Sequence, residues 1–487
     1  MNLPTAGPTA RTTPPVVVIA VLGLSSLFVS LMQSLVIPIQ LELPDLLGTT
    51  RSNASWVVTA TLLGGAVAMP VAGRLADIVG KKPVLVASAL LMLAGSLVCA
   101  LSDSLAPMLV GRVFQGLAMG YIPVAISFVR EVAPRHLVNT AVASISAMLG
   151  VGGALGLPLA AWIAESLDWH ALFWVSLGLA AVMSLMSLLL LPHVHDAHDA
   201  RLDAIGVIGL AVGLVSFLVA VSKGNDWGWT SATTLGLMLG GVAVLVVWGA
   251  YELRHDDPLV DLRTMSTRPV LLTNLAALLI GFGMMAQFIV IPQLLETPEA
   301  TGYGLGQSIL HAGLWMAPGG LMMLLFAPVS SKLLSTVGGR YTLVIGGGVL
   351  SLGYVVSVFL TDAPWQLLIA TCIGSAGVGI GYAAMPTIIL ENVPAAEAGA
   401  SVGLNGLMRS VGTTVAGAIM AVVLTSKTME FGPTGIEIPT LGAYQLCFII
   451  GAVAAAVGAV TAALVYPLRS SKLPREQLAV HETVSAS

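Results

Sequence analysis

Long apolar stretches dominate the chain, and each is about as long as a helix that crosses a bilayer. Runs of about 20 mostly apolar residues recur between short polar or charged connections. Fourteen runs can be counted, and we expect each to form one membrane-spanning helix. The predicted helices lie near residues 16–39, 54–73, 83–102, 105–128, 138–163, 170–191, 204–222, 232–251, 269–294, 305–329, 341–361, 364–390, 398–425 and 442–466.

The composition agrees with this pattern. Of the 487 residues, 56% are hydrophobic and only 9% are charged, whereas soluble domains carry about 25% charged residues. The chain is therefore predicted to be an all-α polytopic membrane protein in contact with the lipid bilayer. We expect the run from Val16 onward to be a retained first helix, because no cleavage site follows it.

Lysine and arginine are unevenly distributed over the predicted connections. With the N-terminus in the cytoplasm, fifteen of the 20 basic residues fall on the cytoplasmic side and three on the outer side. The other two, Arg112 and Arg409, lie inside predicted helices. Because cytoplasmic loops of membrane proteins are enriched in basic residues, we expect both termini to be cytoplasmic. The expected location is the cell membrane (inner or plasma membrane).

Two parts of the chain repeat each other. Gln33 and Glu42 recur as Gln287 and Glu296 at the same spacing, within similar Val-Ile-Pro segments. This predicts two six-helix halves with an inserted helix pair between them. Parallel repeats of this kind occur in secondary transporters, where the substrate site lies between the halves. The predicted units are a tail at 1–15, the halves at 16–191 and 269–466, the inserted pair with its loops at 192–268, and a tail at 467–487.

A charged segment separates the second and third predicted helices, with Gly73, Asp77, Gly80, Lys81 and Lys82 at fixed spacing. The glycines allow helix ends to approach and the chain to reverse. The carboxylate is placed to cap or face the positive end of a helix, and the lysines resist translocation. The spacing resembles the loop signature of the major facilitator superfamily, except that Ile78 stands where the family usually has a base. The resemblance implies that this loop latches the two halves on the cytoplasmic side.

The order of six helices, two inserted helices and six helices is similar to the fourteen-helix drug:proton antiporter branch of that superfamily, over residues 16–466. The resemblance implies a major facilitator fold, alternating access, and a cavity lined by the first, fourth, ninth and twelfth helices. It also implies proton-coupled export of a hydrophobic or amphipathic small molecule, such as a drug, antibiotic or metabolite. Such a protein would confer multidrug efflux.

The fourth predicted helix contains Arg112 and Gln115, three residues apart and so on one face. A charge inside an apolar helix is costly and indicates a function by default. Arg-x-x-Gln-Gly resembles the superfamily's signature for this helix, in which the arginine is linked to proton coupling. The alternative is an arginine that extends to the outer membrane interface.

The fifth predicted helix carries small residues at three- and four-residue spacing, including Gly152 and Gly156, followed by Pro158. The segment resembles an exporter signature of the superfamily, but the proline comes one residue late and alanines replace the last two glycines. The alternative is that these residues only allow close helix packing.

The first predicted helix departs most from the family, whose drug-exporting members usually place an aspartate there. Gln33 is among its central polar residues, and none of them titrates. Glu42 and Glu296 are the repeat-related acids near the outer rim and become candidates for the proton site, or are solvated helix ends. Residues in the second half that could line the pathway are Gln287, Asn405 and Arg409. Acids near the cytoplasmic face could instead form gating salt bridges: Asp77, Glu131 and Glu391 with Lys81, Arg130 or Arg135.

Several functions are excluded or disfavoured. No phosphate-binding loop and no metalloprotease or hydrolase motif is present, so we expect no enzymatic activity, no metal, no nucleic-acid partner and no cofactor beyond a proton gradient. We expect a monomer that binds protons and a small-molecule substrate. The alternative is a transporter of anionic metabolites or lipid-like molecules without proton antiport based on a first-helix acid, because both buried charges are cationic.

Overall fold

The computed structural model describes residues 13–40, 42–194, 201–431 and 436–465. Fourteen helical segments in these residues are long and apolar enough to cross a membrane, which confirms the predicted number. Most of the predicted first tail (residues 1–12) and all of the second (467–487) lie outside the described residues, and the domain boundaries stay a prediction.

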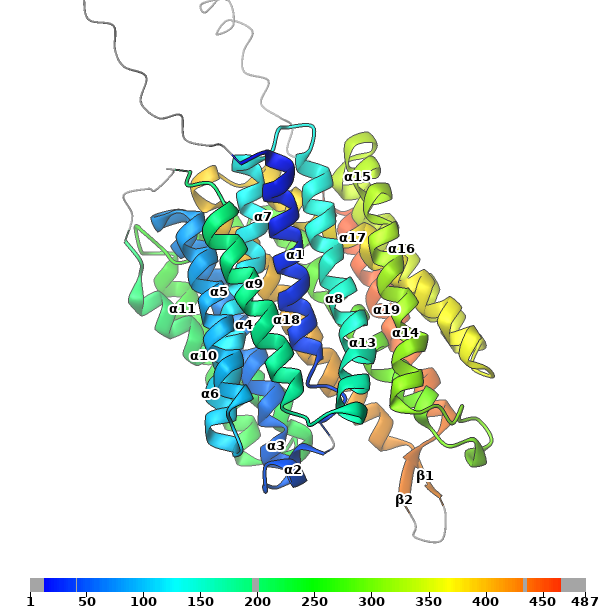
Figure 1. Ribbon diagram of the computed structural model, residues 1–487. Coiled ribbons are helices and arrows are strands. Elements are labelled where there is room, and N and C mark those ends of the chain that lie inside the picture. Colours follow the sequence, from blue (N-terminus) through cyan, green and yellow to red (C-terminus); the bar gives the residue numbers. More distant parts are fainter. Residues whose placement is uncertain (1–12, 41, 195–200, 432–435, 466–487) are drawn as a thin grey trace, which may run out of the picture.

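The spanning helices alternate in direction through one bundle (Figure 1). Four spans contain more than one helical segment: α3 (Arg51–Ala54) precedes α4, η1 (Ala118–Gly120) joins α6 to α7, α14 leads directly into α15, and η3 (Ala395–Glu397) precedes α18. The helices are α1 (Pro15–Ser34), α4 (Trp56–Val79), α5 (Lys81–Ala100), α6 (Leu105–Leu117), α7 (Tyr121–Val132), α8 (Val138–Ser166), α9 (Ala171–Leu190), α10 (Ala204–Trp227), α11 (Ala232–Glu252), α13 (Arg268–Glu296), α14 (Ile309–Leu325), α15 (Ala327–Thr336), α16 (Gly338–Phe359), α17 (Pro364–Asn392), α18 (Ala398–Ser426) and α19 (Leu441–Ala463).

The two ends of the bundle differ. The hairpin end, at the bottom of Figure 1, carries short helices α2 (Leu43–Leu46) and α3 (Arg51–Ala54) and an antiparallel hairpin of β1 (Thr428–Phe431) and β2 (Ile436–Pro439). The opposite end holds the junction of α4 and α5 and short helix α12 (Leu262–Met265), and we call it the loop end. The hairpin was not predicted, because its strands are only four residues long.

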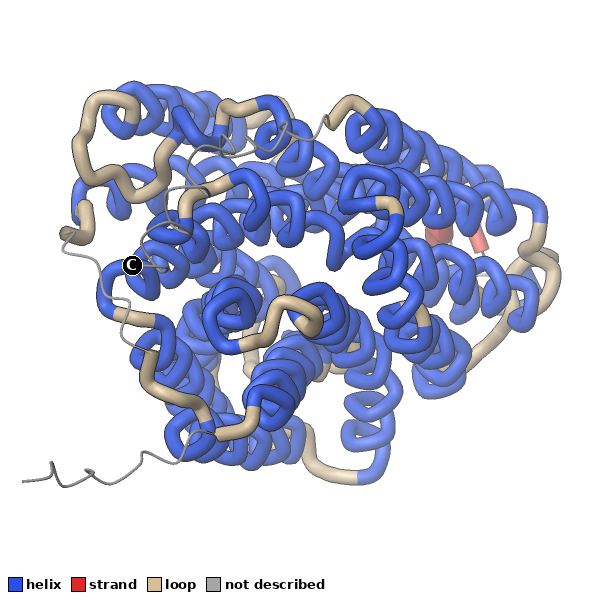
Figure 2. Tube along the Cα trace, turned by 90° about the horizontal axis from the view of Figure 1, so that it is seen from above, coloured by secondary structure: helices blue, strands red, loops and turns tan. Residues whose placement is uncertain are grey.

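The six helices before the insertion and the six after it pack in the same pattern. In the first half α1 packs on α8, and α5 packs on both α6 and α9. In the second half α13 packs on α18, and α16 packs on both α17 and α19. This common pattern is what the internal repeat predicts, and the view along the bundle in Figure 2 shows the helices grouped around a common centre.

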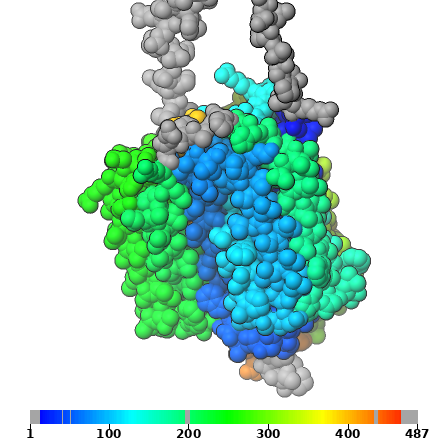
Figure 3. Space-filling model, turned by 60° about the vertical axis from the view of Figure 1, so that its left-hand side comes forward, coloured from blue at the N-terminus to red at the C-terminus, as the bar shows by residue number. Residues whose placement is uncertain are grey.

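Between the halves, two long seams form the main contact: α4 with α18, and α8 with α14. Small residues let both seams close tightly, because a side chain in place of Gly73 would collide with the backbone of Gly399, and one in place of Gly320 would collide with Ala154. The inserted helices α10 and α11 pack against each other, and α10 also contacts α4 and α18. Figure 3 shows this pair along one edge of the molecule.

Candidate functional site

The predicted loop at residues 73–82 is shorter than expected. We predicted helices that end near residue 73 and begin near residue 83, but α4 continues to Val79 and α5 begins at Lys81. Only Gly80 lies outside the helices, with a φ of 93° that disfavours any residue with a side chain. Polar side chains at the end of α4 and the start of α5 therefore do not break the helices, because packing against the second half shields them.

Asp77 joins the two halves at the loop end. Its carboxylate accepts backbone N–H bonds from Gly399 at 3.0 Å and Ala400 at 2.9 Å, at the first turn of α18. The side chain is only 2% exposed. A carboxylate at a helix N-terminus satisfies otherwise unpaired N–H groups and is favoured by the helix dipole. The structure thus places Asp77 where the sequence suggested, facing the positive end of a helix, and identifies that helix as α18.

Lys81 holds the carboxylate from the other side. Its ammonium group lies 3.5 Å from Asp77 and also contacts Glu131 at the end of α7. Lys82 donates instead to the carbonyl of Leu191 at 2.7 Å, within its own half. Of the two neighbouring lysines, Lys81 therefore supports, from within the first half, the carboxylate of Asp77 that crosses to the second half, and Lys82 ties α5 to the end of α9.

A second bond crosses between the halves nearby. Arg130 donates from Nη1 to the carbonyl of Leu390 on α17 at 2.9 Å. We weighed salt bridges from Arg130 to acids at this end, but its recorded partner here is a backbone carbonyl. Together with Asp77, it closes the loop end of the bundle in this conformation.

Arg112 is buried inside the first half and does not extend to the membrane interface. It is 1% exposed, and its guanidinium donates to the carbonyl of Val57 at 3.0 Å and to Oε1 of Gln115 at 2.7 Å. Gln115 in turn donates to Ser96 on α5 at 3.0 Å. The pair predicted from its three-residue spacing is therefore a hydrogen-bonded unit that connects α4, α5 and α6.

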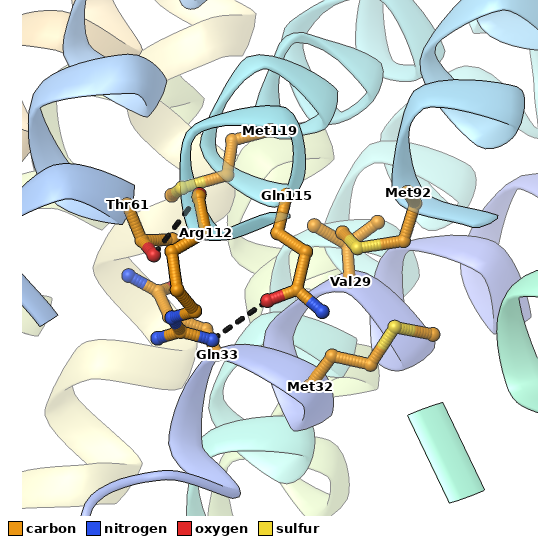
Figure 4. Close-up of a pocket in the computed structure, with 8 residues that line it drawn as sticks. All are labelled: Val29, Met32, Gln33, Thr61, Met92, Arg112, Gln115 and Met119. Atoms are coloured by element: carbon orange, nitrogen blue, oxygen red, sulfur yellow. Dashed lines mark hydrogen bonds between the residues drawn. The ribbon is translucent and has the colours of Figure 1, made fainter. Parts of the chain in front are cut away.

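A small cavity of about 10 Å³ lies beside this pair, which is room for about one water molecule. Gln33 of α1 reaches it, and Figure 4 shows Gln33, Arg112 and Gln115 together with three methionines. Its lining consists of Val29, Met32, Gln33, Thr61, Met92, Arg112, Gln115 and Met119. No carboxylate is among these residues, so the buried cation faces amide, hydroxyl and thioether groups.

The candidate pathway residues of the second half form separate contacts. Gln287 is buried on α13 and donates to the carbonyl of Thr371 on α17 at 3.2 Å. Asn405 is buried on α18 and donates to Asn274 of α13 at 2.9 Å. One turn further along α18, the Arg409 guanidinium lies 4.9 Å from the centre of the Tyr382 ring, a distance at which the cation and the ring attract each other.

The two acids proposed as proton sites do not lie with Arg112. Glu42 is exposed at the start of α2, and Glu296 is half-buried at the end of α13, both toward the hairpin end. Their matching positions reflect the internal repeat. Among the described residues, neither carboxylate has a recorded hydrogen bond or ion pair, although Glu296 lies near the buried Tyr444.

The glycines of α8 use two faces of the helix. A side chain at Gly152 would collide with the backbone of α1 and one at Gly156 with Ser34 of the same helix, whereas Pro158 lies against Gly313 of α14. The segment therefore sits in close contact with α1 on one side and with the second half on the other. Both interpretations of this motif, an exporter signature and close packing, are compatible with that placement.

Sequence reasoning missed one buried cation, Lys223. We assigned it to an outer connection, but it lies within α10 and is 1% exposed. Its ammonium group contacts Ser55, donates to the carbonyl of Ser52 at 2.7 Å, and lies 3.3 Å from Asp226. The sequence did not indicate this buried contact, because a lysine close to the end of an apolar run usually extends its ammonium group to water.

Comparison with known proteins decides the family. Residues 22–417 match the model of the Major Facilitator Superfamily. The chain belongs to the major facilitator superfamily. It is 26% identical to the multidrug resistance protein B homolog of Mycobacterium tuberculosis H37Rv, over 78% of this chain and 70% of that protein. It is 23% identical to the multidrug transporter protein MdtP of Bacillus subtilis, over 77% of this chain and 69% of that protein.

The fold has a counterpart of known structure. The human organic anion transporter MFSD10 superposes with a TM-score of 0.64 at 17% identity, covering 92% of this chain and 99% of that one. Some relatives are longer proteins, of which this chain spans 58%. Family and structural neighbours are transporters and not enzymes, so the chain is a multi-pass membrane transporter.

Proposed function

We propose that this transporter exports hydrophobic or amphipathic small molecules across the cell membrane by alternating access, driven by proton entry. The observation that carries the proposal is the pocket around Arg112. Three methionines form an adaptable apolar wall, while Arg112, Gln115 and Gln33 supply polar groups. The cavity has room for about one water molecule in this conformation, whose loop end is closed, so it would have to widen as the halves move. Its lining then suits an amphipathic molecule whose apolar part is held by dispersion and whose polar part meets the cation.

The contacts at the loop end support alternating access. Asp77 and Arg130 hold the halves together through hydrogen bonds to backbone groups of the opposite half. The loop end can therefore open when these hydrogen bonds break. For export, the loop end would face the cytoplasm, and binding from that side would require these bonds to break. The basic residues that the structure describes at the loop end, such as Lys81 and Arg130, agree with that orientation.

A second candidate is transport of anionic metabolites or lipid-like molecules without proton antiport. The cavity lining contains one cation and no carboxylate, so an anionic substrate would gain a charge-assisted hydrogen bond there. In this alternative, Arg112 would bind substrate and would not tune an acid.

Everted membrane vesicles with a pH-sensitive dye distinguish the two. An inward-acid gradient is challenged with lipophilic cations, neutral drugs and organic anions, in wild type, Arg112→Ala and the control Arg254→Ala, whose residue is exposed at the loop end. We expect at least one compound to dissipate the gradient with wild type and the control but not with Arg112→Ala. Labelled anions that cross without proton movement would refute proton coupling and favour the second candidate.

A further inference from the structure

Two buried carboxyl groups face each other in the inserted helix pair. Asp203 immediately precedes α10 and Glu252 is the last residue of α11, so both lie at the loop end. Asp203 is 8% exposed and Glu252 is 2% exposed. Neither group belongs to the pocket around Arg112 or to the contact between the halves.

One oxygen of each carboxyl group has a structural partner. Oδ1 of Asp203 caps α10 by accepting the N–H of Ile205 at 3.0 Å, and it also accepts the hydroxyl of Tyr251 at 3.2 Å. Oε2 of Glu252 accepts the N–H of Val260 at 3.3 Å. These bonds account for the burial of both residues and for the fixed direction of their side chains.

The other oxygen of each group is buried without a hydrogen-bond partner. These are Oδ2 of Asp203 and Oε1 of Glu252. Both point to the same place, because a Cβ atom on Gly206 would collide with each of them. The indole N–H of Trp248, one turn before Glu252, is also buried, and it lies close enough to the Glu252 carboxyl group to interact with it, although no hydrogen bond forms between them here. The glycine thus leaves room beside which both acceptor oxygens lie, 2.4 Å (Glu252) and 2.5 Å (Asp203) from the position that a Cβ atom on Gly206 would occupy.

No cation neutralises these oxygens in the described part of the chain, whose recorded ion pairs involve neither group. Arg201 and Arg254, each two residues from one of the acids, are exposed, and no recorded ion pair joins them to either oxygen. Other titratable groups nearby are engaged elsewhere. From α11, Tyr251 is bonded to the opposite oxygen of Asp203. From the following segment, Asp261 caps α12 and Arg263 donates to the carbonyl of Leu253 at 2.8 Å.

The elements that pack on α10 contribute no neutralising charge either. At the loop end, α4 carries Asp77, which is bonded to α18 and Lys81, and Arg74, which lies near Glu397. Two ionised carboxylates would therefore face each other in a buried site, which is strongly unfavourable. A single proton between the two unpaired oxygens satisfies both of them.

We propose that Asp203 and Glu252 form a protonation site and share one proton between Oδ2 and Oε1. One carboxyl group donates O–H to the other carboxylate, so the pair carries one negative charge. Release of the proton to water at the loop end leaves two negative charges that repel each other. The two groups then titrate as a unit and not as separate residues.

The site is connected to the contact between the halves. Glu252 holds Val260, the next residues form α12, and Thr264 of that helix lies against Glu397, at the start of α18. Asp77 binds the same end of α18. If the two carboxylates moved apart, Glu252 would displace the segment that runs from Val260 through α12 to the start of α18. Loss or gain of the proton would thereby change the contact between the halves at the loop end. Only this consequence rests on the proposed proton-coupled transport.

Infrared spectroscopy of the purified protein in lipid tests the site without measuring transport. Protonated carboxyl groups show a C=O band that carboxylates lack, and ordinary Asp and Glu side chains are ionised by about pH 7. We expect wild type to retain a protonated-carboxyl band at about pH 7 that disappears in Asp203→Asn and in Glu252→Gln. The control Glu165→Gln, an exposed residue at the end of α8, should leave the band unchanged.

Absence of the band in wild type overturns the proposal, and that result does not depend on how the variants fold. Persistence of the full band in both single variants overturns it as well. Gly206→Ala gives a second test, since the added methyl group should force the oxygens apart and reduce the band. If the band behaves as expected while vesicles show no proton movement, the protonation site stands and the proposed proton coupling fails.

Discussion

The bond between Asp77 and the start of α18 should determine how firmly the loop end closes. Asp77→Asn keeps the size of the side chain but removes its charge. An amide retains one acceptor oxygen, so one of the two backbone bonds, to Gly399 at 3.0 Å or to Ala400 at 2.9 Å, survives in weaker form. The other N–H then meets the amide nitrogen and loses its acceptor.

The size of the effect follows from these contacts. A hydrogen bond to a charged group contributes about 1.5–3 kcal/mol, and a buried N–H left unpaired costs about 1–3 kcal/mol. Because one bond is retained in neutral form, we expect the closed loop end to lose about 2–4 kcal/mol. That corresponds to a shift of about 30- to 700-fold in the equilibrium between closed and open loop ends.

Cross-linking across the seam measures this shift. Thr140 on α8 and Ser331 on α15 lie at the loop end in opposite halves, with their hydroxyl oxygens 2.8 Å apart. In a background without native cysteines, Thr140→Cys and Ser331→Cys should form a disulfide readily, and much more slowly with Asp77→Asn. The control Asp45→Asn, exposed in α2 at the hairpin end, should have no effect. An unchanged cross-linking rate in Asp77→Asn would refute the reasoning.

Three further substitutions test the packing and the buried polar groups. Gly152→Ala should destabilise the protein in thermal unfolding, because the added Cβ atom would lie 2.6 Å from a backbone oxygen of α1. Gly153→Ala should be tolerated, because its Cβ atom would have its nearest neighbour at 3.9 Å; equal melting temperatures would contradict this. Asn405→Leu and Asn274→Leu should each cost about 0.6–1.7 kcal/mol and the double variant less than their sum, so additive losses would exclude coupling through the 2.9 Å bond. Lys223→Met should loosen α10 from α3 and α4 and raise protease cleavage near the inserted pair, since three polar contacts are lost; unchanged cleavage would argue against an anchoring role.

Local sequence properties determined the helices, their number and the order of six, two and six. Hydropathy over a window of about 20 residues reports whether a segment can cross a bilayer, and an internal repeat reports the shared packing of two halves. The pairing of Arg112 with Gln115 was also accessible, because a three-residue spacing places both on one helix face. The same reasoning misjudged the α4–α5 junction, where tertiary shielding extends both helices through polar residues.

Only the tertiary structure decided which groups meet across the bundle. Asp77 and Gly399 are separated by 322 residues in the chain, and no local pattern records that their helices touch. The same holds for Lys223 with Ser52 and for the facing oxygens of Asp203 and Glu252. A hydropathy pattern identifies a helix but leaves its rotation and its neighbours undetermined. Those depend on how small residues at the seams allow particular backbones to approach.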